Sequence, residues 1–380
     1  GIITKADLAS YKPRVYKQLA NTHFRGNLVM CGGPPPSSFA VTQLIVSVMS
    51  ALYPENHGAD ILSDPKVTHH FIEAMKFAYA QRTLLGDVAF VKSAETLAKN
   101  LTTQEYTKWV VERMRDTAQP SVYYGGIAQS QVPQPVEFGK CGARVVPDHG
   151  TSQVSALDEH GNGVSSTTTI NRWFGAAVES EAYGIIWNDE MDDFSTPGMA
   201  NGFGFAPSET NFIEPGKRPM SSMSPMVIFD AKTKEPTMVI GGSGGSKIIS
   251  AVAKVGLMKL HVIVGESVIM AIVRPLIFGE TIKQAIDSPM IHNQFTPDIT
   301  QIDDAFPKEL KSVLDWKFGQ KFRNTTGFEG IVQGITYLIG QCDHLKQLPN
   351  WLMKFAHYSK LRVSIRYQEV VPPEGRKKGP

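Results

Sequence analysis

The sequence predicts an α+β fold in which helices pack outside two β layers. Three observations lead to this prediction. The first third of the chain has helical apolar patterns, and the segment from Thr151 to Ile240 is patterned as successive β-hairpins. A glycine run, Gly241 to Gly245, then ends a strand and opens a further helix. Strands grouped in hairpins, with helices before and after them, are typical of this fold class.

Composition and charge are those of an ordinary globular protein. The chain has 380 residues, of which 42% are hydrophobic and 19% charged, and its net charge is +2. Because positive and negative side chains are nearly equal in number, the charge argues against a nucleic-acid or membrane-surface partner. Three cysteines, Cys31, Cys141 and Cys342, cannot all pair and therefore predict no disulfide framework. The apolar region from Ile248 to Phe278 is interrupted by charged residues, so we do not expect it to span a membrane.

The first part of the chain is predicted to be mostly helical. Thr4 and Asp7 have the spacing of a capping box, and Leu8 and Tyr11 begin an apolar face. The other elements expected here are a strand at 27–30, a proline-rich loop at 32–36, helices at 39–52, 66–85 and 104–115, and a long exposed connection at 118–149.

Two kinds of short motif are only weak evidence for function, because such patterns often occur by chance. His69 and His70 lack a third ligand at a usable spacing, so exposed or cap-bonded histidines are expected and no metal site. The sequons at Asn100 and Asn324 predict glycosylation and fit a secreted protein.

The middle of the chain is organised around a hairpin that begins at Gly150-Thr151. A strand at 151–159 alternates between two faces, and the turn His160-Gly-Asn-Gly163 supplies the positive φ angles of a tight hairpin. The β-branched stretch 164–171 is its second strand. Beyond it we predict a strand at 184–187, an acidic turn at 188–193, a loop at 196–219 and hairpin strands at 226–229 and 238–240.

A threonine that heads a strand directly after a glycine has a chemical use. If the Gly150–Thr151 bond were cut, Thr151 would own both a hydroxyl nucleophile and a free α-amine. An α-amine has a pKa of about 7.7–8.0, so it can act as general base for its own hydroxyl near neutral pH. Gly150 would leave the carbonyl unshielded by a Cβ. The alternative is an ordinary hairpin entry, and the sequence downstream decides between the two.

An ordered series of motifs follows Thr151. The series is Thr151-Ser-x-Val-Ser, Asn162-x-Val-Ser-x-Thr-x-Thr169-Ile-Asn171-x-x-Phe-Gly175, Gly184-Ile-Ile-x-Asn188-Asp-Glu190-Met-Asp-Asp193-Phe-Ser195, Asn211-Phe-Ile-x-Pro-Gly-Lys-x-Pro-x-Ser221-Ser222-Met-x-Pro225 and Gly241-x-x-Gly244-Gly245. In order and spacing it resembles the γ-glutamyltransferases (glutathione hydrolases) of the N-terminal-nucleophile hydrolase superfamily, in particular the animal enzymes. The resemblance extends upstream through Phe77-Ala-Tyr-Ala-x-Arg-Thr-Leu-Leu-Gly-Asp87 and Tyr123-Tyr124.

The resemblance implies a four-layer αββα sandwich and a chain cut in two. Residues 1–150 would be the C-terminal part of a large subunit and 151–380 the small, catalytic subunit, paired as a heterodimer from one precursor. The implied substrates are glutathione and related γ-glutamyl compounds, with an amino acid or dipeptide as acceptor and no cofactor. The implied location is the extracellular face of the plasma membrane, or secretion.

The resemblance also implies a role for each motif residue. Thr151 would attack the γ-carbonyl, Thr169 would orient it, and the amides of Gly244 and Gly245 would hold the oxyanion. The glutamyl end carries an ammonium and a carboxylate, and an unpaired buried charge costs several kcal/mol, so a pocket needs both acceptors and donors. The implied acceptors for the ammonium are Asn171, Glu190 and Asp193, and the implied donors for the carboxylate are Ser221 and Ser222.

The chain departs from the family pattern in several places. The N-terminal portion that carries the family's membrane anchor and carboxylate-clamping arginine has no counterpart, so a fragment or truncated, inactive paralogue is an alternative. Arg218, in the same loop as Ser221, is a better local substitute for that arginine than Arg172. The segment 254–267 resembles an insertion, and the match loosens beyond Gly340.

A serine hydrolase is a further alternative. Gly241-Gly-Ser243-Gly-Gly245 matches the G-x-S-x-G elbow, and Asp287 and His292 follow in the order of a triad. That fold requires repeated strand–helix units before the elbow, whereas hairpins precede it here.

Overall fold

The computed structural model describes residues 4–24, 26–54, 59–127, 150–158, 160–201, 203–255, 288–325, 331–337 and 361–365. At its centre is an antiparallel six-stranded sheet in the order β1-β2-β7-β8-β12-β13. The strands are β1 Ala20–Phe24, β2 Leu28–Gly32, β7 Met226–Asp230, β8 Pro236–Ser243, β12 Ile331–Tyr337 and β13 Leu361–Ile365. Strands that precede Gly150 therefore pair directly with strands that follow it.

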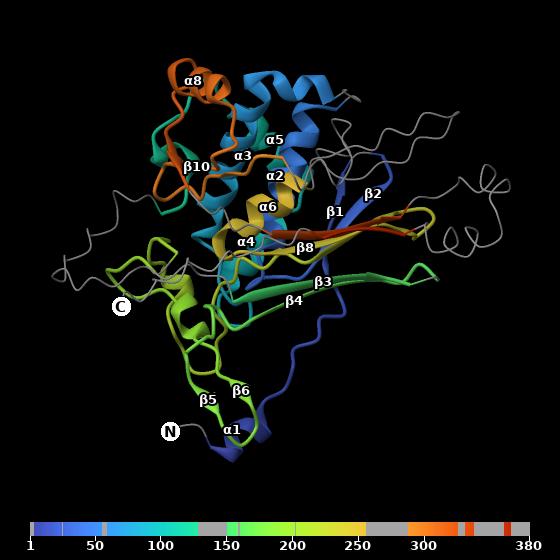
Figure 1. Cartoon of the computed structure of the whole chain (residues 1–380), viewed down its shortest axis with the longest axis vertical. Helices are drawn as coiled ribbons and strands as arrows, with labels where there is room; N and C mark the ends of the chain where they lie inside the picture. The colour runs from blue at the N-terminus through green and yellow to red at the C-terminus, as the bar shows by residue number, and fades with distance from the viewer. Residues whose placement is uncertain are drawn as a thin grey trace, which may run out of the picture.

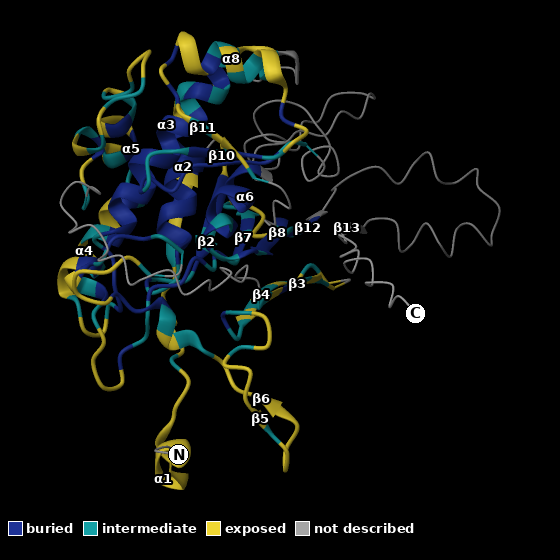
Figure 2. Cartoon of the chain, turned by 60° about the vertical axis from the view of Figure 1, so that its left-hand side comes forward, coloured by how far each residue is buried: buried dark blue, intermediate teal, exposed yellow. Residues whose placement is uncertain are grey.

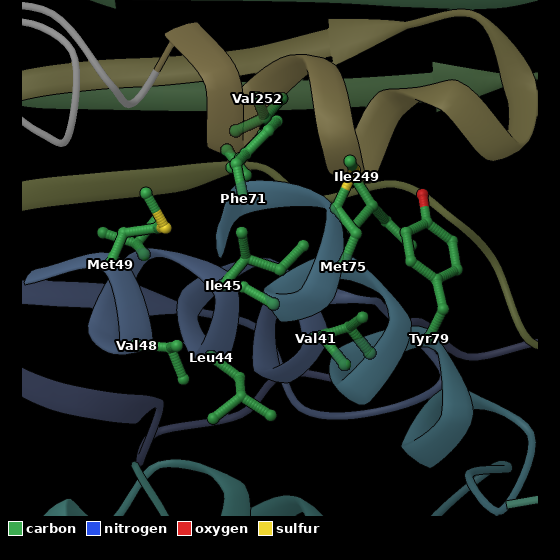
Figure 3. Close-up of a cluster of buried hydrophobic side chains, with 14 of the residues drawn as sticks. Val41, Leu44, Ile45, Val48, Met49, Phe71, Met75, Tyr79, Ile249 and Val252 are labelled. Carbon is green, nitrogen blue, oxygen red and sulfur yellow. The ribbon is translucent and has the colours of Figure 1, made fainter. Parts of the chain in front are cut away.

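Helices cover one face of this sheet (Figure 1). The central ones are α2 Phe39–Leu52, α3 Pro65–Arg82 and α6 Ile248–Val255, with α4 Lys92–Leu101 and α5 Gln104–Val111 against α2. Figure 3 shows their shared core, in which Ile45 and Met49 of α2 lie near Phe71 and Met75 of α3 and Val252 of α6. Burial of such side chains supplies the main favourable free energy of folding, about 1.5–3 kcal/mol each.

The hairpin of β3 Thr151–Leu157 and β4 Gly163–Thr169 lies on the opposite face of the sheet (Figure 1). It packs on β8 and β12. The alternation predicted for β3 is confirmed, because Gln153 is buried against Gly241 while Val154 is 62% exposed. In the described part of the chain, the six-stranded sheet therefore lies between a layer of helices and the two-stranded β3–β4 sheet.

Smaller elements complete the structure. Beside the motifs that follow Thr151 in sequence are the hairpin β5 Glu179–Ser180 and β6 Ile185–Ile186, the 3-10 helices η4 Glu190–Asp193 and η5 Glu209–Asn211, and η6 Gly245–Lys247 at the start of α6. Elsewhere lie α1 Lys5–Ser10, η1 Ala59–Ser63, η2 Ser121–Tyr124, β9 Ile291–His292, β10 Thr300–Ile302, α8 Lys308–Trp316 and β11 Phe322–Asn324. No helix in the described parts of the chain combines the length and apolar character needed to cross a membrane.

Two expectations about the first part of the chain need correction. The Thr4–Asp7 capping box is present, but Leu8 on α1 is 62% exposed and packs on no core (Figure 2). The stretch from 118 is not wholly an exposed connection, since Tyr124 is fully buried against Phe77. Sequence patterns also missed β1, α4 and α8. Most of 254–267, together with 128–149, Cys141 and Cys342, falls outside the described residues.

A buried polar network fixes α3 to the segment around 298–320. Glu73 on α3 accepts hydrogen bonds from Tyr124 Oη at 2.8 Å and Gln320 Nε2 at 2.8 Å. Lys76, one turn later, pairs with Asp298 at 3.0 Å. His69 is buried rather than exposed, with its ring nitrogens bonded to Arg115 O and Gln320 Nε2. Because Gln320 and Asp298 follow Thr151 in sequence, this network joins the two predicted subunits.

Candidate active site

Thr151 lies at the first residue pair of the β3–β4 ladder, opposite Thr169. Their hydroxyl oxygens are 3.0 Å apart. Thr169 Oγ1 also accepts the backbone N–H of Asn171 at 2.9 Å. Thr167, on the same strand, bonds to Gln153 instead, and Thr168 faces outward. Of the three consecutive threonines, the one predicted from the motif is the one that meets Thr151.

Gly150 is held in the same ladder. Its N–H donates to Asn171 O at 2.8 Å, and its carbonyl accepts from Ile170 N at 3.3 Å. A Cβ at this position would lie 2.2 Å from Arg172 O, so only glycine fits without a backbone shift. The close approach of the backbone at residue 172 therefore requires a glycine at position 150. This is a second reason for glycine, beside the unshielded carbonyl expected from sequence.

Asn171 connects the hairpin to the acidic turn. It has a positive φ of 70°, a conformation that Asn tolerates better than most residues, and its side chain is buried. Its Nδ2 donates to Asp189 O at 3.2 Å, which fixes the direction in which the amide faces. Arg172 pairs with Asp189 and Asp192 on the same turn. Arg172 is therefore engaged with acidic residues and is not a free clamp.

Glu190 and Asp193 form a close carboxyl pair at the two ends of η4. Burial, reinforced by the charge of Glu190, raises the pKa of Asp193 well above its usual value. Burial likewise raises the pKa of Glu190, and Asp189 adds to that shift. Glu190 Oε2 is buried and accepts no hydrogen bond within the described chain. A cation placed between these carboxyl groups would relieve both effects, as the ammonium of an amino acid would.

Ser221 and Ser222 lie in a buried loop beside α2. The Ser221 backbone is fixed by Pro36 O and by the Ser38 hydroxyl. Each serine hydroxyl oxygen accepts one N–H, from Met223 for Ser221 and from Arg82 for Ser222. Since a hydroxyl that accepts still has a proton to donate, both side chains can serve as donors.

Asn211 joins the acidic turn to the serine loop. Its Nδ2 donates to Asp193 O at 2.8 Å, and its Oδ1 accepts Met220 N at 2.9 Å. Sequence reasoning assigned Asn211 no role, although it begins the motif that ends at Ser222. Its place at the start of the motif was the only signal in the sequence, and its two hydrogen-bond partners could not be deduced from spacing.

Gly244 and Gly245 form the turn from β8 into η6, with φ angles of 119° and 56°. Such angles favour glycine and turn the backbone amides of a strand–helix junction towards one side. Tyr79 of α3 anchors this turn by donating to Ser246 O at 2.7 Å. The sites expected for oxyanion and carboxylate are thus both attached to α3, through Tyr79 and Arg82.

His292 argues against the serine-hydrolase alternative. Its two ring nitrogens bond to Ser250 Oγ at 2.8 Å and Gln294 Oε1 at 3.1 Å, so neither is directed at Ser243. The antiparallel central sheet is also unlike the parallel sheet that carries a nucleophile elbow. Asp287 lies outside the described residues.

Comparisons with known proteins identify the family to which the chain is similar. Residues 1–345 match the family model described as gamma-glutamyltranspeptidase. The chain is 35% identical over 341 residues to scoloptoxin SSD14 of Scolopendra dehaani, covering 90% of this chain and 53% of that protein. It is 34% identical over 334 residues to the glutathione hydrolase proenzyme of Pseudomonas sp. (strain A14), covering 85% and 50%. The chain therefore spans about half the length of the curated relatives it matches.

A likeness in fold extends to more distant structures. The crystal structure of cephalosporin acylase from Bacillus halodurans superposes with a TM-score of 0.64 at 19% sequence identity, covering 89% of this chain and 52% of that one. At this identity the likeness concerns the fold alone.

Proposed function

The chain belongs to the γ-glutamyltranspeptidase family, and from that premise we propose that it cleaves itself at Gly150–Thr151 and then transfers or hydrolyses γ-glutamyl groups. The contact between Thr151 Oγ1 and Thr169 Oγ1 is the observation that carries the proposal. It gives Thr151 a fixed direction at the head of a strand. Residues 1–150 and 151–380 are then the two subunits of a heterodimer, within a four-layer αββα sandwich.

The reaction follows from the residues around Thr151. The hydroxyl of Thr151 attacks the γ-carbonyl of glutathione or a related amide, and the newly freed α-amine takes its proton. The amides of Gly244 and Gly245 hold the oxyanion, and the protonated leaving amine departs as cysteinylglycine. Water, or the amine of an amino acid or dipeptide, then attacks the γ-glutamyl ester and regenerates the threonine.

The two charged ends of the glutamyl group fit the two halves of the site. Asn171, Glu190 and Asp193 accept from the ammonium, and Ser221 and Ser222 donate to the carboxylate. The carboxyl pair, of which Asp193 is buried and Glu190 half-buried, and the unpaired Glu190 Oε2 support the first half, and the two held serine hydroxyls support the second. Secretion or an extracellular location fits the sequons, because Asn100 and Asn324 are both exposed and open to glycosylation.

Mass spectrometry of the purified chain tests the proposal. We expect two segments, of 150 and 230 residues, the second beginning at Thr151, and a single uncut chain in Thr151→Ala. A γ-glutamyl adduct should map to the peptide that begins at Thr151. An uncut, folded wild-type chain would favour the inactive-paralogue alternative, and an adduct on the peptide containing Ser243 would favour the serine hydrolase.

A further inference from the structure

Arg82, at the end of α3, is a buried arginine that contacts the serine half of the proposed pocket. Only 8% of its surface is exposed. A guanidinium remains charged in a protein, so its burial is tolerated only where other groups compensate the charge. It donates to Ser222 Oγ at 3.2 Å and stacks over the Phe205 ring at 4.0 Å. Its Nε is buried and makes no hydrogen bond in the described part of the chain.

The position of Arg82 is set by the helix and by an aromatic stack. Tyr79 lies one turn earlier on α3, so both side chains project from the same face. The Tyr79 hydroxyl is fixed on Ser246 O, and its ring stacks on Phe205 at 6.3 Å. Phe205 therefore contacts both the Tyr79 ring and the guanidinium. With both neighbours immobilised, Arg82 has little freedom to leave Ser222.

The hydrogen bond from Arg82 changes what Ser222 can do. Because the guanidinium donates to Oγ, the serine proton must point elsewhere, and its oxygen is polarised by a full positive charge. A hydroxyl whose oxygen accepts from a cation is a stronger donor than an isolated one. Arg82 thereby strengthens the Ser222 hydroxyl as a donor to an anionic group.

The same charge acts on the acidic turn. Asp193 faces the negative groups Glu190 and Asp192, both of which raise its pKa, and Arg82 is the positive group that opposes them. The effect is mutual, since burial lowers the pKa of Arg82 while Asp193 counteracts that shift. Asn211 holds Asp193 beside the serine loop, so the arrangement does not depend on the charges alone.

We propose that Arg82 is a positioning residue for both ends of the glutamyl zwitterion: it directs the Ser222 hydroxyl to the carboxylate, and its positive charge opposes the negative charges around Asp193. This rests on the proposed function. Of the two local arginines considered from sequence, Arg172 pairs with the acidic turn, whereas Arg82 donates directly to Ser222.

The first test measures hydrolysis of a γ-glutamyl anilide against pH. Arg82→Gln should raise KM about 10- to 100-fold, with a smaller change in kcat, and move the acidic limb of kcat/KM to higher pH. Arg82→Lys keeps the positive charge but lacks the planar guanidinium. It should therefore return the acidic limb to its wild-type pH and lower the raised KM only partly. Arg113→Gln is the matched control, since Arg113 also stacks over an aromatic ring at 4.0 Å, that of Trp109. Equal profiles for Arg82→Gln and Arg113→Gln would overturn the proposal.

A second measurement is independent of turnover. In the uncut Thr151→Ala chain without ligand, the carboxyl carbon of Asp193 is followed by NMR against pH and assigned with Asp193→Asn. Arg82→Gln should move this titration to higher pH, and Arg82→Lys should return it. An unchanged titration would overturn the role of Arg82 even in an active enzyme. If the Asp193 titration shifted as expected but the wild-type chain had no γ-glutamyl activity, the role of Arg82 would be supported and the proposed function refuted.

Discussion

Thr151 Oγ1 lies 3.0 Å from Thr169 Oγ1, across the first residue pair of the β3–β4 ladder. Thr169 Oγ1 is itself fixed by the backbone N–H of Asn171 at 2.9 Å. The hydroxyl that meets Thr151 is therefore held by the main chain, independently of any ligand. This makes the direction of the proposed nucleophile a property of the hairpin.

Replacing Thr169 with valine removes this hydroxyl and preserves the β-branched shape. We expect Thr169→Val to lower kcat of γ-glutamyl transfer about 10- to 100-fold, because a part-buried hydrogen bond to the proposed nucleophile is lost. Thr168→Val is the matched control, since Thr168 faces outward on the same strand. The comparison uses steady-state kinetics, and equal rates for the two variants would remove Thr169 from the mechanism.

The carboxyl pair should make stability depend on pH. The pKa of Glu190 is raised in the folded chain, so its contribution is fully present below the ordinary carboxyl pKa and is lost as pH rises through the raised value. Glu190→Gln removes this pH-dependent loss of stability, and it also removes the negative charge that Glu190 places beside Asp193. We therefore expect a higher melting temperature than wild type at pH 7–8 and little difference at pH 4, together with weaker binding of glutamate.

An exposed glutamate supplies the control for this experiment. Glu181→Gln, in the β5–β6 hairpin, should leave the difference between the two pH values unchanged. Calorimetry at both pH values gives the comparison. A destabilised Glu190→Gln at pH 7–8 would mean that the carboxylate is already compensated in the free protein.

Gly150 should be the most sensitive position for self-cleavage besides Thr151. An alanine Cβ would lie 2.2 Å from Arg172 O and 2.8 Å from Asn171 O, so the ladder at the scissile bond must shift. Gly150→Ala is expected to slow cleavage at least about tenfold, as followed on denaturing gels over time. Ser152→Ala, on the exposed face of β3, should cleave at the wild-type rate. Cleavage of both at one rate would show that the backbone approach is unimportant.

Local pattern was enough to predict the hairpin and the glycine turn. The alternation of β3 gave the faces on which Thr151 and Gln153 lie, because a strand has a fixed period of two. The Gly244–Gly245 turn followed from a strand that ends in glycines before a helix. These features depend on neighbours in sequence.

Features that depend on distant partners could not be predicted in this way. Arg82 and Ser222 are 140 residues apart, and nothing in the spacing indicates that they meet. His69 was expected at the surface or at a cap, but Gln320, 251 residues away, supplies a partner that allows burial. The central sheet pairs β2 with β7 for the same reason. Tertiary packing decided each of these cases.

The network around Glu73 should hold the two segments together after cleavage. Glu73→Ala removes the acceptor of Tyr124 and Gln320 and leaves Lys76 with Asp298 alone. Breaking such a buried cluster costs about 3–5 kcal/mol. We expect the segments of the cut variant to separate at lower urea concentration, as measured by size-exclusion chromatography. Glu112→Ala, which removes an exposed pair with Lys108, should cost less than about 1 kcal/mol.

The proposed oxyanion role of the glycine turn gives the last prediction. Gly244 has φ 119° and ψ 37°, which a residue with a Cβ adopts only with strain. Gly244→Ala should therefore turn the amides away from the developing oxyanion and lower kcat about 10²–10³-fold, with little change in KM. Ser243→Ala alters the neighbouring side chain and keeps the backbone, so it should retain most of the activity. If Ser243→Ala instead abolished activity and Gly244→Ala were tolerated, the turn would be a nucleophile elbow and Thr151 an ordinary strand residue.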